Sequence, residues 1–180
     1  MTDFTFHDLT TATGESKEIL EQVQKGYGFV PNLFGYMAEA PIALKAYLQL
    51  NELLSESSIP AGQLQVALLA ISKKNECDFC STAHHAMSKN YGSNEQTVSA
   101  ILNGTDIEDL QDRVLVKTVT AILENKGWVS EDLLNTFFEA GFTKQQYFEL
   151  MVVVAIKTLS NYTNHVTKPE VNPELIKMIG

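Results

Sequence analysis

The chain has 180 residues, a formal net charge of −9 and a hydrophobic content of 44%. This length predicts one domain covering residues 1–180, with a core large enough to need no disulfide or metal. The acidic balance excludes general nucleic-acid binding and disfavours an anionic membrane surface as a partner. Because no basic, apolar leader opens the sequence and no apolar run reaches the ~18 residues of a membrane span, we expect a cytoplasmic protein.

Apolar residues recur at helical spacing along almost the whole chain, and Gly, Pro and Asn interrupt them. Helices are predicted over residues 15–27, 32–38, 42–55, 63–73, 75–90, 94–102, 108–125, 130–140 and 143–162. The segment 63–73 is apolar on all sides, so we expect a central, buried helix there. The tail after Thr167 is expected to pack on a neighbouring element or to fray. The sequence therefore predicts an all-α helical bundle.

Some residues outside the main motif also carry expectations. Ser93 and Gln96 resemble a capping box for the helix 94–102. Trp128 is expected to anchor the core or an interface. The acidic residues between Asp106 and Asp112 are interpreted as the solvated start of a helix, which the helix dipole favours. For His165, packing or a C-terminal dipole role is favoured over catalysis.

The most informative motif is Cys77-Asp-Phe-Cys80-Ser-Thr-Ala-His84. On a helix at about 100° per residue, Cys80 lies about 60° from Cys77, and His84 lies about 40° from Cys80. The two thiols and the imidazole therefore share one face, whereas His85 is rotated about 140° from Cys80. These two are the only cysteines of the chain.

Such an arrangement suits thiol redox chemistry. The thiolate is the reactive form of cysteine, and a helix N-terminus and a nearby His both favour it. A sulfenic acid formed on one cysteine can condense with the other to a disulfide. Two other interpretations stay open: the cysteines are small buried core residues, or they bind zinc with His84 and a fourth ligand such as Glu76 or His165.

The segment from about Pro60 to Gly92 resembles the alkylhydroperoxidase D (AhpD)-like core of the carboxymuconolactone decarboxylase superfamily. The similarity consists of an apolar helix from Gln63 that leads into Cys77-x-x-Cys80-x-x-x-His84. Pro31-Asn-Leu-Phe and the helix before it are similar to the peroxidase-related subgroup. The resemblance implies an AhpD-like all-α fold, a redox core at about residues 60–92 and a homo-oligomer.

The resemblance also implies an activity and roles for residues. It implies a thiol-dependent peroxidase that acts on hydrogen peroxide or organic hydroperoxides without a cofactor or metal. Cys80 would attack the peroxide, Cys77 would resolve it as a disulfide, and His84 would belong to a proton relay. An external thiol donor, in the family a lipoyl-bearing protein, would regenerate the dithiol.

The sequence departs from the family pattern at the relay carboxylate. The family usually has Glu twelve residues before the first cysteine, where this chain has Gln65. An amide can form hydrogen bonds but cannot carry a proton at neutral pH. Phe79 also replaces the His of the founding peroxidases. We therefore keep two alternatives: a non-enzymatic redox-sensing dithiol module and a carboxymuconolactone decarboxylase-like enzyme.

Overall fold

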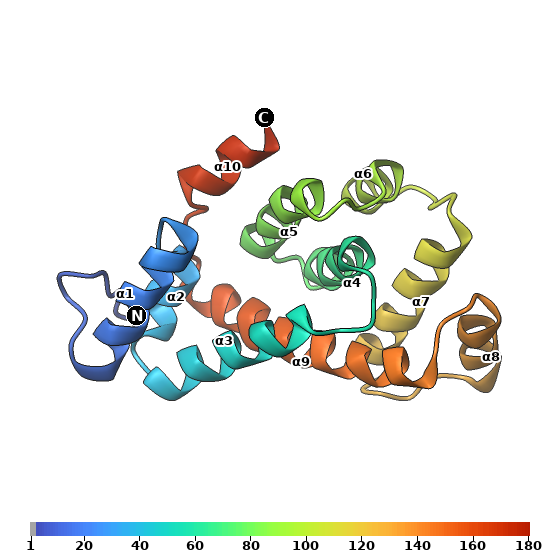
Figure 1. Ribbon diagram of the computed structural model, residues 1–180, viewed down its shortest axis with the longest axis horizontal. Coiled ribbons are helices and arrows are strands. Elements are labelled where there is room, and N and C mark those ends of the chain that lie inside the picture. The colour runs from blue at the N-terminus through green and yellow to red at the C-terminus, as the bar shows by residue number, and fades with distance from the viewer. Residues whose placement is uncertain (1–2) are drawn as a thin grey trace.

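The computed structural model describes residues 3–180, and this part of the chain is helical and contains no β-strand (Figure 1). Its ten helices are α1 (Gly14–Tyr27), α2 (Asn32–Met37), α3 (Pro41–Ser55), α4 (Ala61–Lys74), α5 (Asp78–Asn90), α6 (Glu95–Asn103), α7 (Leu110–Glu124), α8 (Glu131–Glu139), α9 (Lys144–Thr167) and α10 (Pro173–Ile179). The predicted all-α bundle is confirmed. No helix among the described residues is long and apolar enough to cross a membrane.

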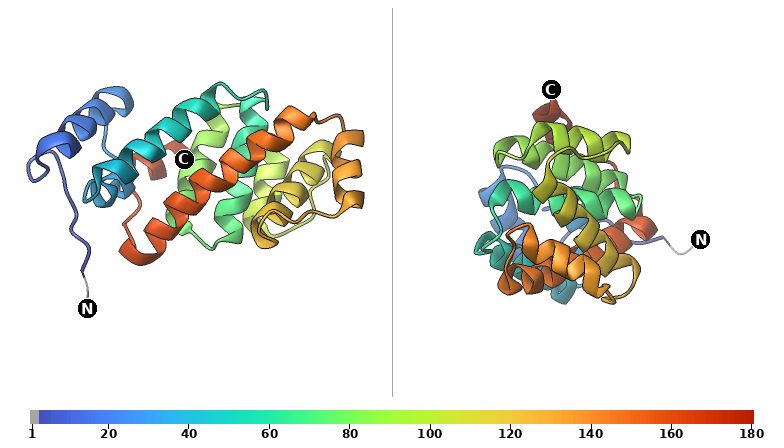
Figure 2. Two further views of the ribbon diagram at one scale, coloured as in Figure 1. Left: turned by 90° about the horizontal axis from the view of Figure 1, so that it is seen from below. Right: turned by 90° about the vertical axis from the view of Figure 1, so that its right-hand side faces the viewer.

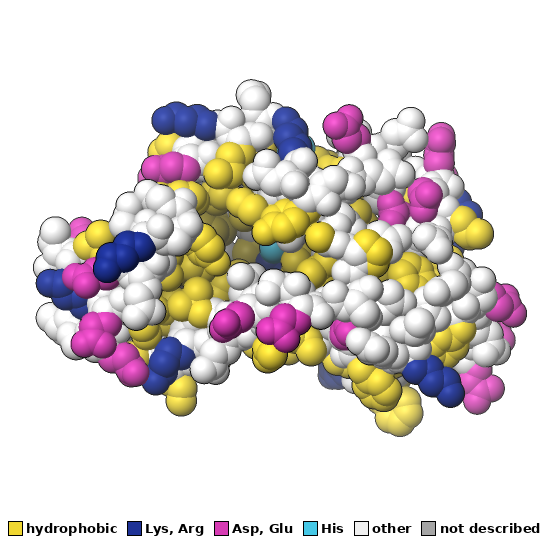
Figure 3. Space-filling model, in the orientation of Figure 1, with side chains coloured by type: hydrophobic (Ala, Val, Ile, Leu, Met, Phe, Trp, Pro, Cys, Tyr) yellow, Lys and Arg dark blue, Asp and Glu magenta, His cyan; other side chains and the backbone are white. Residues whose placement is uncertain are grey.

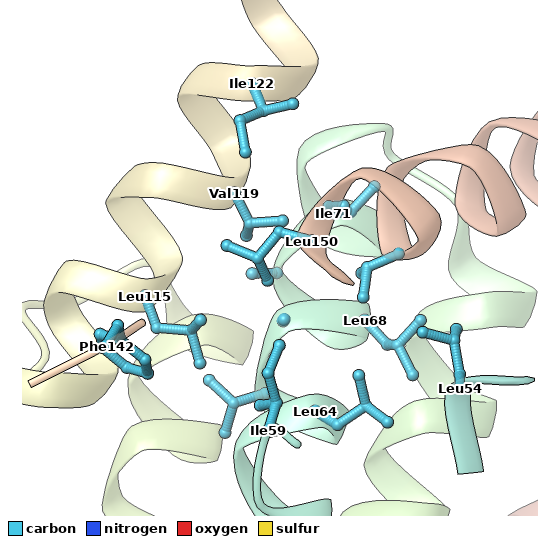
Figure 4. Close-up of a cluster of buried hydrophobic side chains, with 14 of the residues drawn as sticks. Leu54, Ile59, Leu64, Leu68, Ile71, Leu115, Val119, Ile122, Phe142 and Leu150 are labelled. Atoms are coloured by element: carbon cyan, nitrogen blue, oxygen red, sulfur yellow. The ribbon is translucent and has the colours of Figure 1, made fainter. Parts of the chain in front are cut away.

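Helix α4 forms the centre of the bundle because apolar residues surround it. Its residues from Val66 to Ser72 are all buried, and α5, α6, α7 and α9 pack around it. Figure 4 shows Leu64, Leu68 and Ile71 of this helix close to side chains of α7 and α9. The predicted central helix is confirmed, and its burial fixes the position of α5.

A second hydrophobic cluster lies where α1, α2 and α3 meet α5. It includes Leu20, Phe34 and Leu44 together with both cysteines. Figure 2 shows α1 and α2 at one end of the molecule, with α7 and α8 at the other. The cysteine pair therefore lies between the central helix and the N-terminal helices.

The junction between α4 and α5 places Cys77 just outside the helix. Glu76 has a positive φ of 54°, and the Cys77 N–H donates to Ser72 O at 2.9 Å, which closes the end of α4. Cys77 has extended backbone angles and is the N-cap of α5, which begins at Asp78. The expected start at residue 75 or 76 was therefore two or three residues early.

Other helix ends also differ from their predicted positions. Asn94, not Ser93, caps α6, since its side chain accepts from the N–H groups of Gln96 and Thr97. The Ser93 hydroxyl instead donates to Gly62 O at 2.8 Å. Helix α9 extends to Thr167, five residues beyond the predicted end. This extension carries Asn164 to the cysteines.

Two expectations for single residues were wrong. Trp128 is 85% exposed and belongs to no core cluster, because the turn after α7 holds it outside the bundle, so only its expected place in the core was wrong and its place in an interface stays a prediction. Asp112 is buried, not solvated: it accepts from the Thr97 hydroxyl at 2.7 Å and from Gln63 Nε2 at 3.3 Å. These donors replace the water that a buried carboxylate loses.

The C-terminal tail forms a helix that packs on its own chain. Helix α10 lies against α5, and Leu175 is buried in the cluster that contains the cysteines. The Asn32 N–H donates to Asn172 Oδ1 at 2.7 Å, which fixes the loop before α10 to the start of α2. The tail therefore covers one side of the cysteine helix.

Candidate active site

The two cysteines are held between the start of α5 and the end of α9. Both are free thiols and each is 3% exposed. Asn164 Nδ2 donates to Cys80 Sγ at 3.2 Å and to Cys77 Sγ at 3.5 Å. One amide therefore contacts both sulfurs and holds them on the same side of α5.

The surroundings divide the pair into one acidic and one weakly acidic thiol. The hydrogen bond that Cys77 donates lowers the pKa of Cys80 well below its ordinary value, and the charge of Lys157 adds to this against the effect of burial. Donating that hydrogen bond, together with burial, raises the pKa of Cys77. The geometry therefore favours a thiolate on Cys80 and a thiol on Cys77.

Lys157 is a buried cation inside this site. It lies on α9, is 1% exposed, and its Nζ lies 2.9 Å from His84 Nε2. A buried ammonium is costly unless it is paired. The Cys80 thiolate is the anion that can balance it, and no other ion pair of Lys157 occurs within residues 3–180.

The contacts of His84 fix where its ring carries a proton. Its Nδ1 lies 3.0 Å from Gln65 Oε1, which can only accept a hydrogen bond, so Nδ1 is the protonated nitrogen. Nε2 then presents its lone pair to Lys157, whose ammonium can only donate. Three side chains therefore form one chain of hydrogen bonds, Gln65 to His84 to Lys157.

This chain differs from the expected relay in two ways. Burial, first, and the charge of Lys157 lower the pKa of His84 well below its ordinary value of 6.5, so the ring is neutral at physiological pH. Within the described part of the chain, His84 makes no hydrogen bond to either cysteine; Lys157 occupies the position next to Nε2. The structure thus brings Gln65, His84, Cys77 and Cys80 together, with Lys157 added.

Aromatic rings lie near Cys80. Tyr47 lies near enough for the Cys80 charge to add to burial in raising its pKa, and its ring packs edge-on against Phe34 with centroids 5.2 Å apart. Phe34 also contacts the ring of Tyr27, which is 48% exposed. Figure 3 shows a hollow with hydrophobic walls between α1 and α2 on one side and α5 on the other.

A small pocket reaches Gln65 from the same side. It has a volume of about 170 Å³, and its lining includes Asn51, Leu68 and the exposed Tyr91. Asn51 Nδ2 donates to the Tyr27 hydroxyl at 3.4 Å, which places Tyr27 next to this pocket. A molecule that enters here meets the Tyr91 ring and the amides of Asn51 and Gln65, and no carboxylate lines this pocket within residues 3–180.

Neither of the residues considered as a fourth zinc ligand contacts the thiols. Glu76 and His165 are exposed and lie at the outer end of the pair, where they line a separate pocket. No group of three or more His, Cys, Asp and Glu side chains in residues 3–180 is placed to hold a metal ion.

The structure was compared with solved structures. One match is described as an alkylhydroperoxidase AhpD core, an uncharacterized peroxidase-related protein from Ralstonia eutropha JMP134; it has a TM-score of 0.82 and 22% identity over 96% of this chain and 93% of that one. An uncharacterized peroxidase-related protein from Silicibacter sp. TM1040 has a TM-score of 0.79 and 18% identity, over 96% and 92%. The chain has the AhpD-like fold.

Another AhpD-like match is the debrominase Bmp8, with a TM-score of 0.74 and 16% identity over 99% of this chain and 97% of that one. A cysteine-to-alanine variant of Bmp8 has been solved in complex with 2,3,4-tribromopyrrole. No protein-family model and no curated protein matches the sequence. The AhpD-like fold is thus shared by proteins named for different reactions.

Sequence reasoning missed two residues of this AhpD-like site, Lys157 and Asn164. Both lie on α9, more than 70 positions from the cysteine motif. A lysine next to an apolar run is usually interpreted as a surface residue whose charge reaches water. One signal was present: Lys157 directly follows the apolar run 152–156, and a charge that is buried with such a run needs a partner.

Proposed function

We propose that this protein is a dithiol oxidoreductase that reduces peroxides with Cys80 as the attacking thiolate and Cys77 as the resolving thiol. The observation that carries the proposal is the buried Lys157 ammonium beside Cys80. This cation stabilises the reactive thiolate, and it can also neutralise the negative charge that develops on the departing oxygen of the peroxide. The AhpD-like fold, shared with peroxidase-related proteins, supports the same class.

The oxidative half-reaction balances with the residues in place. The Cys80 thiolate attacks one peroxide oxygen, the O–O bond breaks, and the departing alkoxide takes a proton from the Lys157 ammonium. The product on the protein is a Cys80 sulfenic acid. The Cys77 thiol then attacks that sulfur and releases water, which leaves a Cys77–Cys80 disulfide and a neutral Lys157 amine.

The reductive half-reaction restores the starting state. Two thiols of an external donor reduce the disulfide and are themselves oxidised to a disulfide. Their two protons return to Cys77 and Lys157. We propose, as the resemblance to the AhpD-like core implies, that a lipoyl-bearing protein is one such donor. In this scheme His84 orients Lys157 through Nε2 and does not carry the proton itself.

The test is a stopped-flow reaction of the reduced protein with hydrogen peroxide and with cumene hydroperoxide, with free thiols counted at each time. The expected result is the loss of two thiols for each peroxide consumed. Cys80→Ser should abolish the reaction, and Cys77→Ser should stop it at a sulfenic acid. An unchanged rate in Cys80→Ser, or no peroxide-dependent loss of thiols in the wild type, would overturn the proposal.

A second candidate is reductive debromination of an aromatic compound. The rings of Tyr27, Phe34 and Tyr47 favour it, because they form an aromatic cluster near Cys80. The Cys80 thiolate would take the bromine, the ring carbon would gain a proton, and Cys77 would then displace bromide to form the disulfide. Release of bromide from a bromopyrrole by the reduced protein would favour this candidate, and its absence would exclude it.

Two further possibilities are decided by the same measurements. A redox-sensing module would be oxidised once and slowly, without turnover in the presence of a donor. A carboxymuconolactone decarboxylase-like enzyme would act without loss of thiols.

We also propose that the chain forms a homo-oligomer, since Trp128 and Phe148 are 85% and 70% exposed. Sedimentation of the wild type tests this, and a monomer at micromolar concentration would contradict it.

A further inference from the structure

A second pocket opens at the other end of the cysteine pair. It has a volume of about 430 Å³ and lies where the start of α5 meets the end of α9. Cys77 and Asn164 line it, and the exposed residues Glu76, Asp78 and Lys168 contribute charges of both signs. It shares no lining residue with the pocket at Gln65. Cys77, at the start of α5, lines only this pocket, and Gln65 of α4 lines only the other.

The Asn164 side chain has one hydrogen-bonding atom that the protein leaves without a partner. Asn164 is 5% exposed, and its Nδ2 is used by the two sulfurs. Its Oδ1 is buried and has no hydrogen-bond partner among residues 3–180. A buried acceptor without a partner costs free energy, and a ligand that donates a hydrogen bond would remove that cost.

The chemistry of thiol exchange selects the same end of the pair. An attacking thiolate can break a disulfide at either sulfur, and it reacts faster when the sulfur it displaces is the more acidic thiol. Attack on Cys77 displaces Cys80, the thiolate that Lys157 stabilises. The reverse attack would displace Cys77, whose thiolate has no buried cation to stabilise it. Access to Cys77 through the pocket and the stability of the departing Cys80 thiolate therefore both favour attack of the donor on Cys77.

We propose that the pocket at Cys77 binds a second reducing donor besides the lipoyl-bearing protein, a small aliphatic thiol that carries both an ammonium and a carboxylate group. This inference rests on the proposed dithiol function and adds the place and class of the donor. Lys168 can pair with the carboxylate, and Glu76 or Asp78 with the ammonium. Asn164 Oδ1 is buried, so a donor N–H or S–H can reach it once this side chain turns towards the pocket.

The exchange proceeds in two balanced steps. The donor thiolate attacks Cys77 Sγ, the Cys77–Cys80 bond breaks, and Cys80 leaves as a thiolate while the donor's proton returns to Lys157. A second donor molecule then attacks the donor sulfur of the mixed disulfide on Cys77. This releases the oxidised donor and a Cys77 thiol that takes the second proton.

The test uses wild-type protein oxidised to the disulfide with diamide, so that it does not depend on peroxide activity. Reduction by glutathione, which is zwitterionic, is timed by thiol counting and compared with reduction by dihydrolipoamide, which lacks these charges. We expect His165→Trp, which fills the pocket, to slow reduction by glutathione at least about tenfold. The matched variant Asn51→Trp fills the opposite pocket and should leave this rate within about twofold.

The two variants should behave in the reverse way towards peroxide. His165→Trp should keep the wild-type rate of oxidation, and Asn51→Trp should slow it. Lys168→Glu should weaken the response to glutathione about fivefold and leave dihydrolipoamide unchanged, because only the former carries a carboxylate. Equal slowing of both donors by Lys168→Glu, or an unchanged glutathione rate in His165→Trp, would overturn the proposal.

A second measurement stays informative if a variant fails to fold. Iodoacetamide present during reduction of the wild type would alkylate the released thiolate and preserve the mixed disulfide. Peptide mapping should find glutathione on Cys77 and the alkyl group on Cys80, and the opposite assignment would overturn the proposal. If the wild type does not react with peroxide but glutathione still reduces its disulfide as described, the result counts only against the peroxidase function.

Discussion

Lys157 Nζ lies 2.9 Å from His84 Nε2, and this contact joins a buried cation on α9 to the histidine of the cysteine helix. The imidazole accepts from the ammonium, so His84 positions a charge next to Cys80 while staying neutral itself. A carboxylate on the other side of His84 would favour an imidazolium; Gln65 does not. The site thus places its positive charge on lysine.

Replacing Lys157 by Met should make Cys80 much less reactive at neutral pH. Because the lysine charge lowers the pKa of Cys80, its loss raises that pKa and reduces the thiolate fraction. The rate of alkylation by iodoacetamide at pH 7 should fall about tenfold or more. In the wild type the rate is lost only as pH falls through the lowered pKa; in Lys157→Met that loss should move to higher pH.

The control for this change is Lys117→Met, which removes an exposed lysine of α7. It should leave the alkylation profile unaltered. Lys157→Arg keeps the charge and should restore part of the reactivity. Identical pH profiles for the wild type and Lys157→Met, with native circular dichroism in both, would mean that Lys157 does not set the reactivity of Cys80.

Gln65→Glu should increase the rate of peroxide reduction. A carboxylate 3.0 Å from His84 Nδ1 would stabilise an imidazolium and allow the ring to carry a proton, which the amide does not. We expect an increase of several-fold in the single-turnover rate, within the ~10²-fold or more that general acid–base catalysis provides. Gln65→Met serves as the control, and an unchanged rate in both would show that position 65 only fills space.

His84 should not titrate between pH 6 and 8 in the folded protein. Nitrogen chemical shifts of labelled histidine should show the proton on Nδ1 throughout this range, because burial and Lys157 hold the pKa of His84 well below 6.5. In Lys157→Met the pKa should move back towards its ordinary value. A proton on Nε2 in the wild type would contradict the hydrogen-bond chain described above.

The lowered pKa of His84 also makes the free energy of unfolding depend on pH. The unfolded chain takes up a proton at His84 near pH 6.5, whereas the folded chain does so only at much lower pH. The free energy of unfolding therefore falls as pH drops below about 6.5. Urea unfolding at pH 7 and pH 5.5, in the wild type and in His84→Gln, measures this contribution as the difference between their pH slopes.

Asp112→Ala should destabilise the fold by about 1–3 kcal/mol, because it leaves the buried Thr97 hydroxyl without its acceptor. It also removes a contact between α7 and α4. Asp106→Ala, in an exposed acidic residue nearby, should change stability by no more than about 0.5 kcal/mol. Denaturant unfolding compares them, and equal stabilities would show that Asp112 is not structurally required.

The local parts of the site could be predicted from the sequence. Helical periodicity placed Cys80 and His84 on one face, and the all-apolar run of α4 indicated a buried centre. The predicted helix 130–140 begins at Ser130, which is the N-cap of α8: its hydroxyl accepts from Leu133 N at 3.3 Å. These features depend on neighbours within one or two turns, which a sequence pattern contains.

The parts that depend on distant contacts could not be predicted in this way. Periodicity gives the face of α9 that carries Lys157 but not what that face meets, and its partner His84 is 73 positions away. Asp112 stands in an acidic stretch that is typical of a solvated helix start, yet Thr97 on α6 reaches it. Trp128 is apolar enough for a core, but a turn carries it outwards. In each case tertiary packing decided the environment.

The two pockets on either side of the cysteine pair have no lining residue in common. If oxidant enters at Gln65 and donor at Cys77, as proposed, a molecule in one pocket does not block the other. Dead-end inhibition of oxidant by donor, common when two substrates alternate at a single opening, then has no steric basis. Steady-state plots should consist of parallel lines that stay straight at high concentrations of either substrate. The rate in a cell would then follow the supply of donor without a penalty for excess.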